Sequence, residues 1–136
     1  MSAEGSREEL ARRVDAIEAG YEMMLAYAAQ GLPTDQGAAS GGQLRAFLER
    51  FDHALTGIAD EYRAYAAANG VGPHPAIDNF LDVLARDAAA AQAGIQLVLG
   101  QSGISSQLVD NLNASIHVRA LLTDIFLVDE LCRPQG

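Results

Sequence analysis

Few residues of this chain could do chemistry, and none has the neighbours that a catalytic group needs. The sequence holds three histidines and a single cysteine, Cys132. Cys132 lies near the C-terminal end with no histidine close to it in sequence, so we expect it to pack rather than to act as a nucleophile. The G-x-S-x-G, P-loop and dinucleotide-binding patterns are missing as well. We therefore expect no catalytic residue and a protein that is not an enzyme.

Metal chemistry in helical proteins needs a particular spacing of glutamate and histidine. Di-iron bundles use Glu-x-x-His pairs together with glutamates from facing helices. The sequence contains no Glu-x-x-His, and Glu49 and His53 are four residues apart with Glu49 off the apolar face. We expect no metal site.

His53 begins the short fragment HALTG and is the first candidate for a chemical role. Phe51 and Leu55 fall on the expected apolar face of a helix, so His53 should point away from it into water. The fragment is similar to the H-x-L-K-G motif of histidine phosphotransfer domains, which are also helical bundles. The resemblance implies that His53 is a phosphoacceptor and that Gly57 leaves room for a partner, although Thr56 stands where that family has lysine. The alternative is a solvated surface histidine.

His117 is the second candidate, because it falls on a helix that would lie beside the first one. In an up-down bundle Met24 and His117 would lie at about the same level, which is similar to the axial Met and His of cytochrome b-type four-helix bundles. A C-x-x-C-H pattern is missing, so covalent haem attachment is not expected. A methionine at a regular core position more often fills a gap.

Three tyrosines fall at positions expected to face the core, where their hydroxyl groups need partners. They could form one wall of a small-ligand cavity or simply the polar edge of a packed core. The candidate interior ligand contacts are Tyr21, Met24, Tyr62, Tyr65 and His117. We expect plain packing and no bound cofactor.

The elements that must position these residues are helices. Apolar residues recur at alternating intervals of four and three over four segments, predicted as helices at about 6–30, 41–69, 75–99 and 105–132. Short connections make consecutive helices antiparallel. The sequence therefore predicts a single all-α domain over residues 1–136, an antiparallel up-down four-helix bundle.

Two predicted helices begin with a capping-box pattern, in which a serine is followed three residues later by Glu or Gln. The pairs are Ser6 with Glu9 and Ser40 with Gln43. Between these helices the glycine-rich segment 31–42 has few apolar anchors, and we expect it to be mobile.

The fourth predicted helix is apolar around nearly its whole circumference toward its end, in the stretch ALLTDIFLVDELC. Three partner helices bury only one stripe of such a helix, and the remaining stripe would be an exposed apolar patch on a monomer. We expect a homodimer through this helix. The predicted interface residues are Leu121, Leu122, Ile125, Phe126, Leu127, Val128 and Leu131.

Composition limits the partners and the location. The formal net charge is −9 and no lysine is present, so binding to nucleic acid or to anionic lipid is not expected. The lack of a long apolar run, of a secretion signal and of a second cysteine predicts a cytoplasmic protein outside the membrane. Abundant alanine and arginine without lysine suggest a bacterial source.

These observations predict a non-catalytic, cytoplasmic bacterial interaction or regulatory module that acts as a homodimer and also binds a protein partner. Two alternatives remain open at this stage. One is a four-helix bundle that binds a small ligand or a cofactor in its interior, and the other is a phosphotransfer module that uses His53.

Overall fold

The computed structural model describes residues 3–71 and 73–132. Within them the chain forms helices and no strand, which confirms the predicted all-α class. Six helices are present instead of four continuous ones: α1 (Ala3–Ala28), α2 (Ala39–Leu55), α3 (Ile58–Ala68), α4 (Pro75–Leu99), α5 (Ser106–Ala114) and α6 (His117–Cys132).

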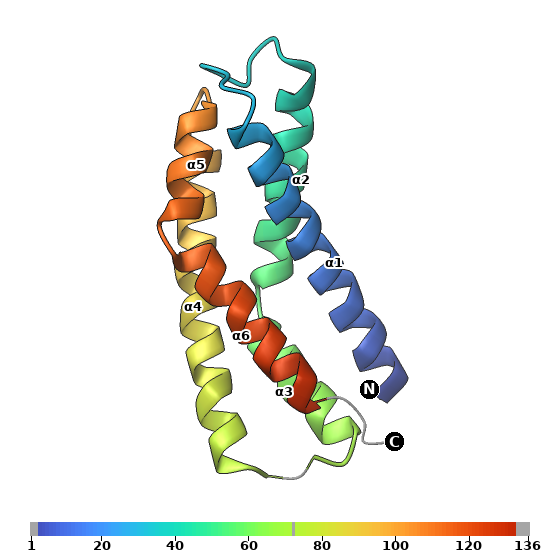
Figure 1. Ribbon diagram of the computed structural model, residues 1–136. Helices are drawn as coiled ribbons and strands as arrows, with labels where there is room; N and C mark the ends of the chain where they lie inside the picture. Colours follow the sequence, from blue (N-terminus) through green and yellow to red (C-terminus); the bar gives the residue numbers. More distant parts are fainter. Residues whose placement is uncertain (1–2, 72, 133–136) are drawn as a thin grey trace.

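The helices lie side by side and alternate in direction (Figure 1). α1 packs against α2, α3 and α5, while α4 packs against α2, α3, α5 and α6. α3 follows α2 in nearly the same direction, and α6 follows α5 in the same way. The start of α1 and the end of α6 lie at the end of the molecule that holds the α3–α4 turn.

The predicted helix over 41–69 is two helices, α2 and α3, which are separated at Gly57. Gly57 has a φ of +73°, a left-handed conformation that glycine adopts without steric cost. The carbonyl groups freed at the end of α2 have donors, because the Arg13 guanidinium donates to the carbonyl oxygens of Ala54 and Thr56. The four-and-three apolar spacing continues across this break, and so periodicity alone predicted one helix.

The predicted helix over 105–132 is also two helices, α5 and α6, separated by Ser115 and Ile116. Ser115 follows the last residue of α5, and its hydroxyl donates to the carbonyl of Leu112 in the last turn of that helix. Ile116 has a φ of +71°, which is rare for a β-branched residue because its Cβ crowds the backbone. The second break therefore carries backbone strain that the first one avoids.

Both predicted capping boxes are wrong. Ser6 is fully buried within α1, and Ser40 lies within α2, where its hydroxyl donates to the Gln30 side chain at 2.8 Å. The residue before α2 is Ala38, which offers no side-chain cap. By contrast, the predicted start at Ser105 is correct for α5, because its hydroxyl accepts from a backbone N–H in the first turn.

The α1–α2 connection was expected to be mobile over 31–42, but in the structure it is held by hydrogen bonds. Asp35 is only 7% exposed. Its Oδ1 accepts from the backbone N–H of Ile104 at 2.7 Å, and its Oδ2 accepts from the Arg45 guanidinium at 2.6 Å. Two residues distant in sequence thus fix this loop to the α4–α5 connection.

Further bonds join the same two connections. The Tyr27 hydroxyl donates to the Ile104 carbonyl at 2.7 Å, and the Ser106 hydroxyl donates to the Tyr27 carbonyl at 2.6 Å. We call Tyr27, Asp35, Arg45, Ile104 and Ser106 the polar lock. Because its members are buried or half-buried, their hydrogen bonds have little competition from water.

The core follows the apolar spacing that the sequence predicts. Met24, Phe51, Tyr62 and Leu84 come from four different helices and are all fully buried. Near the end of α1, however, Tyr27 is the fully buried residue and Ala28 only packs against the core.

Candidate functional site

The inner face of α6 is part of the core. α6 packs against α3, α4 and α5. Its inward side chains are buried to 9% exposure or less: Val118, Leu121, Leu122, Ile125 and Val128. Burial of a side chain of this size stabilises the fold by about 1.5–3 kcal/mol, so this face alone accounts for the attachment of α6.

The outer face of α6 is also apolar, although nothing in the described chain covers it. Phe126, Leu127 and Leu131 are 61%, 53% and 58% exposed. Scattered exposed apolar residues are normal, but these three lie within two turns of one helix and form a continuous patch. Arg119 and Glu130 lie on the same side of α6 and are exposed. We call this surface, with Thr123 at its centre, the outer face of α6.

The structure divides the seven predicted interface residues into two groups. Leu121, Leu122, Ile125 and Val128 are inward residues of this chain's own core, so they are not available to a partner. The residues open to a partner are Phe126, Leu127 and Leu131. The sequence identified the excess of apolar side chains on this helix, and the fold determined which of them remained exposed.

A second feature of α6 could not be expected from the sequence. Asp124 is 7% exposed, and its Oδ2 has no hydrogen-bond partner among the described residues. Burial raises the pKa of Asp124 to about 7, and a hydrogen bond with Asp87 and the negative charge of that group act in the same direction. Asp87 belongs to α4, so two carboxyl groups meet where α4 and α6 pack. In the sequence, Asp124 is a single acidic residue within an apolar stretch, and an acidic residue in such a stretch is expected to face water.

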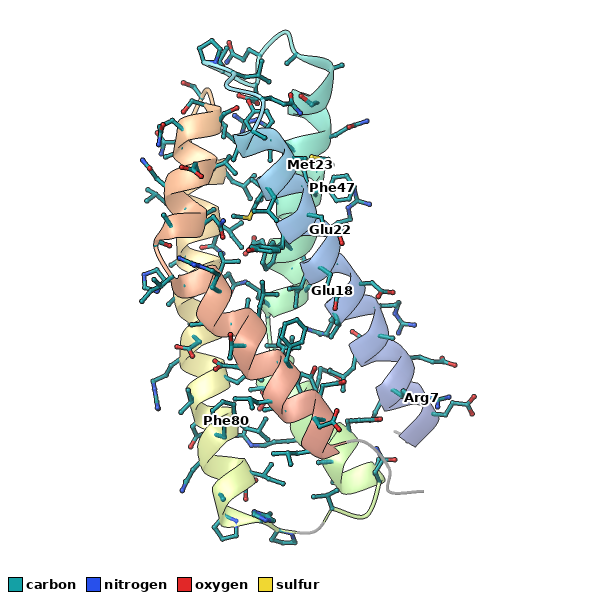
Figure 2. All side chains as sticks on the ribbon, viewed as in Figure 1. Arg7, Glu18, Glu22, Met23, Phe47 and Phe80 are labelled. Atoms are coloured by element: carbon teal, nitrogen blue, oxygen red, sulfur yellow. The ribbon has the colours of Figure 1, made fainter. Side chains whose placement is uncertain are left out.

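A small hollow adjoins the outer face of α6 on the α4 side. It has a volume of about 200 Å³, and its walls include Ile77, Phe80, Val128 and Leu131. Figure 2 shows Phe80 on α4, in the part of the molecule where α6 crosses. Apart from His74, its lining is apolar, which extends the apolar character of the patch.

A groove of about 480 Å³ lies on the other side of α6, toward the first half of α1. Its walls include Leu10 and Val14 on α1, Tyr65 on α3 and Asp129 on α6. Arg7 lies at its edge and projects outward near the start of α1 (Figure 2). The groove mixes isolated charges with apolar side chains, and no pair of its groups is arranged as a nucleophile and a base.

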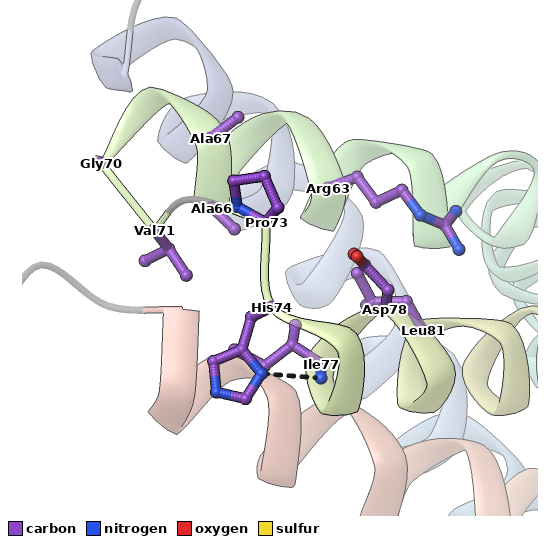
Figure 3. Close-up of a pocket in the computed structure, with 10 residues that line it drawn as sticks. All are labelled: Arg63, Ala66, Ala67, Gly70, Val71, Pro73, His74, Ile77, Asp78 and Leu81. Atoms are coloured by element: carbon purple, nitrogen blue, oxygen red, sulfur yellow. Dashed lines mark hydrogen bonds between the residues drawn. The ribbon is translucent and has the colours of Figure 1, made fainter.

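A cavity of about 390 Å³ lies between the end of α3 and the start of α4 (Figure 3). Two of its three polar side chains, His74 and Arg63, are already engaged within the chain, and the third is Asp78. His74 Nδ1 accepts from the backbone N–H of Ile77 at 3.3 Å and so caps α4. The Arg63 guanidinium bonds Asp82 at 2.7 Å and Asp60 at 3.1 Å, which neutralises its charge. The cavity therefore offers little chemistry to a ligand.

His53 is exposed in the last turn of α2, as the spacing predicts. Its helix ends two residues later, and Gly57 supplies the left-handed break between α2 and α3. The Thr56 hydroxyl accepts from the Gln92 side chain at 2.9 Å, so it is engaged in holding this break. The resemblance to a phosphotransfer domain therefore covers the five letters but not a continuous helix beyond the histidine.

The candidate interior contacts do not converge on one site. Met24 and Tyr62 are fully buried, Tyr65 is 5% exposed and Tyr21 is partly buried against the core. His117 is exposed at the start of α6. The structure therefore does not bring Met24 and His117 together as an axial pair. The side chain of Cys132 lies outside the described residues.

Within the described residues, no three potential metal ligands gather at one place. None of the helices in that part of the chain combines the length and the apolar character needed to cross a bilayer.

Sequence reasoning missed the polar lock and the Asp87–Asp124 pair. Asp35 lies in a glycine-rich segment that resembles an ordinary polar loop, and its partners are 10 and 69 residues away. Only the unusual placement of Asp124 between Leu122 and Ile125 could have indicated a buried carboxyl group.

Comparison of the chain with protein-family models, with curated proteins and with solved structures gave no match.

Proposed function

We propose that this chain is a non-catalytic interaction module of the bacterial cytoplasm that associates with a second copy of itself through the outer face of α6. In this proposal the architecture is an antiparallel up-down four-helix bundle. Its second helix is divided into α2 and α3, and its fourth helix is divided into α5 and α6. The observation that carries the proposal is the exposure of Phe126, Leu127 and Leu131 on one helix.

The distribution of the reactive groups supports a role without catalysis. His53 is at the end of α2, His74 caps α4 and His117 begins α6, so the three histidines lie on different elements. Catalysis by acid and base needs two titrating groups within reach of one substrate. One close pair of titrating groups, Asp87 with Asp124, lies where α4 and α6 pack, and Asp124 is only 7% exposed.

The outer face of α6 has the composition of an interface core. Its aromatic and aliphatic side chains are accompanied by single charges of either sign, Arg119 and Glu130, whereas the chain as a whole carries a net charge of −9. An acidic protein repels most other acidic surfaces at long range. A nearly neutral apolar strip is the part of this surface where two copies can approach.

Sedimentation velocity of the full chain over a range of concentrations tests the proposal. We expect the wild type to show a concentration-dependent dimer and Phe126→Glu to weaken self-association by at least about tenfold, because large exposed aromatic residues often dominate interface energies. Leu25→Glu is the matched control, since Leu25 is 45% exposed on α1 and the substitution adds the same charge. Circular dichroism checks that both variants fold.

A wild type that stays monomeric up to high micromolar concentration contradicts the proposal. So does equal weakening of the dimer by Phe126→Glu and Leu25→Glu, because that result places the contact elsewhere.

A further inference from the structure

The outer face of α6 carries two opposite charges at matching distances from its centre. Arg119, Thr123, Phe126 and Glu130 are spaced by four, three and four residues, so they lie in one row along the helix. At a rise of 1.5 Å per residue, Arg119 and Glu130 are about 16 Å apart along the axis. The midpoint of the row lies between Thr123 and Phe126.

Neither charge has an ion-pair partner of its own. Arg119 and Glu130 form no salt bridge with any residue that the structure describes. The two side chains are also too far apart along α6 to pair with each other. An exposed, unpaired arginine is available to a carboxylate on another molecule.

An antiparallel arrangement of two α6 helices around a two-fold axis satisfies both charges at once. With the axis between Thr123 and Phe126, Arg119 of each copy meets Glu130 of the other, and the pair is made twice. A parallel arrangement instead places Arg119 beside Arg119 and Glu130 beside Glu130, which is repulsive.

Phe126 fits the same register, because it then lies beside Thr123 of the second copy. Thr123 has a small side chain, so it leaves room for the phenyl ring opposite. One large exposed side chain of each copy thus meets a small side chain of the other at the centre of the contact.

On this basis we propose that two copies of the chain dock antiparallel through α6, about a two-fold axis between Thr123 and Phe126, with Arg119 of each copy paired with Glu130 of the other. This inference rests on the proposed function, because it specifies how the two copies meet at the same surface.

A charge-reversal cycle measured by sedimentation velocity tests the pairing. Arg119→Glu and Glu130→Arg each replace two attractive contacts by two repulsive ones, and we expect each to weaken self-association by roughly tenfold. The double variant restores both pairs in reversed orientation and should return to within about threefold of the wild type. Arg86→Glu is a control for the change in net charge, since Arg86 is exposed on α4.

A cysteine placed near the axis gives an independent geometric readout. In a Cys132→Ser background, Thr123→Cys should form a disulfide-linked dimer under mild oxidation, because a residue near a two-fold axis lies close to its own copy. Glu130→Cys is in the same row but far from the axis, and it should remain monomeric on a non-reducing gel.

The outcomes separate this inference from the proposed function. If the wild type dimerises and Phe126→Glu disrupts the dimer, but the charge cycle shows no rescue and Glu130→Cys cross-links as readily as Thr123→Cys, the antiparallel register is wrong and the interaction surface stands. If the wild type is monomeric throughout, both proposals fail.

Discussion

Two parts of this molecule differ in how they bury an aspartate. At the end with the α1–α2 and α4–α5 connections, Asp35 accepts from Arg45 and from the backbone of Ile104, and these bonds hold its pKa below the usual value. In the other half, Asp124 is buried beside Asp87, and its pKa is raised to about 7. Both carboxyl groups are 7% exposed, so burial alone does not determine the direction of the shift.

The difference shows where the molecule is fixed and where it can adapt. The end that contains Asp35 is closed by hydrogen bonds between two loops. The half that contains Asp124 has open grooves on both sides of α6 and an uncovered apolar face. Elements with fewer stabilising contacts are the ones that can respond to a partner. The chain thus keeps its most complete polar network away from the surface that we propose as an interface.

Removing the Asp35 carboxylate should produce the largest change in stability. Asp35→Ala leaves the Ile104 N–H without an acceptor and the Arg45 guanidinium without its carboxylate partner, and we expect a loss of about 3 kcal/mol in the free energy of unfolding. Urea denaturation followed by circular dichroism measures it. Asp60→Ala is the control. The Asp60 side chain is 84% exposed in its ion pair with Arg63, so its removal should change stability by less than about 1 kcal/mol. Similar losses in the two variants contradict the polar lock.

The pKa of Asp124 is shifted in the opposite direction from that of Asp35, so its ionisation should lower the stability of the fold as pH rises. Its pKa in the folded state, about 7, is above that of an unfolded aspartate near 3.9, so the folded state binds more protons between these values and stability falls as pH rises from 4 to 7. Asp124→Asn removes this ionisation. We expect it to be more stable than the wild type by about 2 kcal/mol at pH 8, with a much smaller difference at pH 4.

Urea denaturation of both proteins across this pH range measures the effect. A constant difference between them at every pH would show that Asp124 ionises normally. Asp110→Asn, at an exposed position on α5, is the control for the loss of one carboxylate.

The two helix breaks allow a smaller and more local comparison. Gly57 and Ile116 have φ values of +73° and +71°, yet one is glycine and the other β-branched. A Cβ atom at Gly57 would meet no other atom within 4 Å, so Gly57→Ala tests backbone strain and should cost about 1–2 kcal/mol.

Ile116→Gly should instead stabilise the fold by about 0.5 kcal/mol, since relief of the strain is partly offset by the greater freedom of glycine in the unfolded chain. Thermal denaturation resolves both changes. Destabilisation by both variants shows that Ile116 makes contacts worth more than its strain.

Much of the helical content followed from local patterns. Alternating four-and-three apolar spacing located the helical segments, Pro75 begins α4, and Gly70, with a φ of +76°, follows α3. The breaks at Gly57 and Ile116 were missed because the apolar spacing passes through both. The false caps at Ser6 and Ser40 show that a capping pattern within a helix-forming stretch does not fix where the helix begins.

The sequence predicted that the last helix carries an apolar surface, but it did not predict which residues of that helix form it. An apolar stretch such as IFLVDEL requires cover on more than one side, and the structure leaves Phe126, Leu127 and Leu131 exposed. Which side faced inward depended on where α4 and α3 lay. The exposed position of His53 followed from its spacing relative to Phe51 and Leu55.

The sequence by itself determined the helical class, the acidic charge and the excess of apolar residues on the last helix, because these depend on composition and on spacing over a few turns. Tertiary structure decided the polar lock, the opposite pKa shifts of Asp35 and Asp124, and the division of α6 into a buried and an outer face. Each of these depends on groups that are far apart in sequence and meet only in the folded chain. The environment of a carboxyl group is set by those neighbours and not by the residues beside it along the chain.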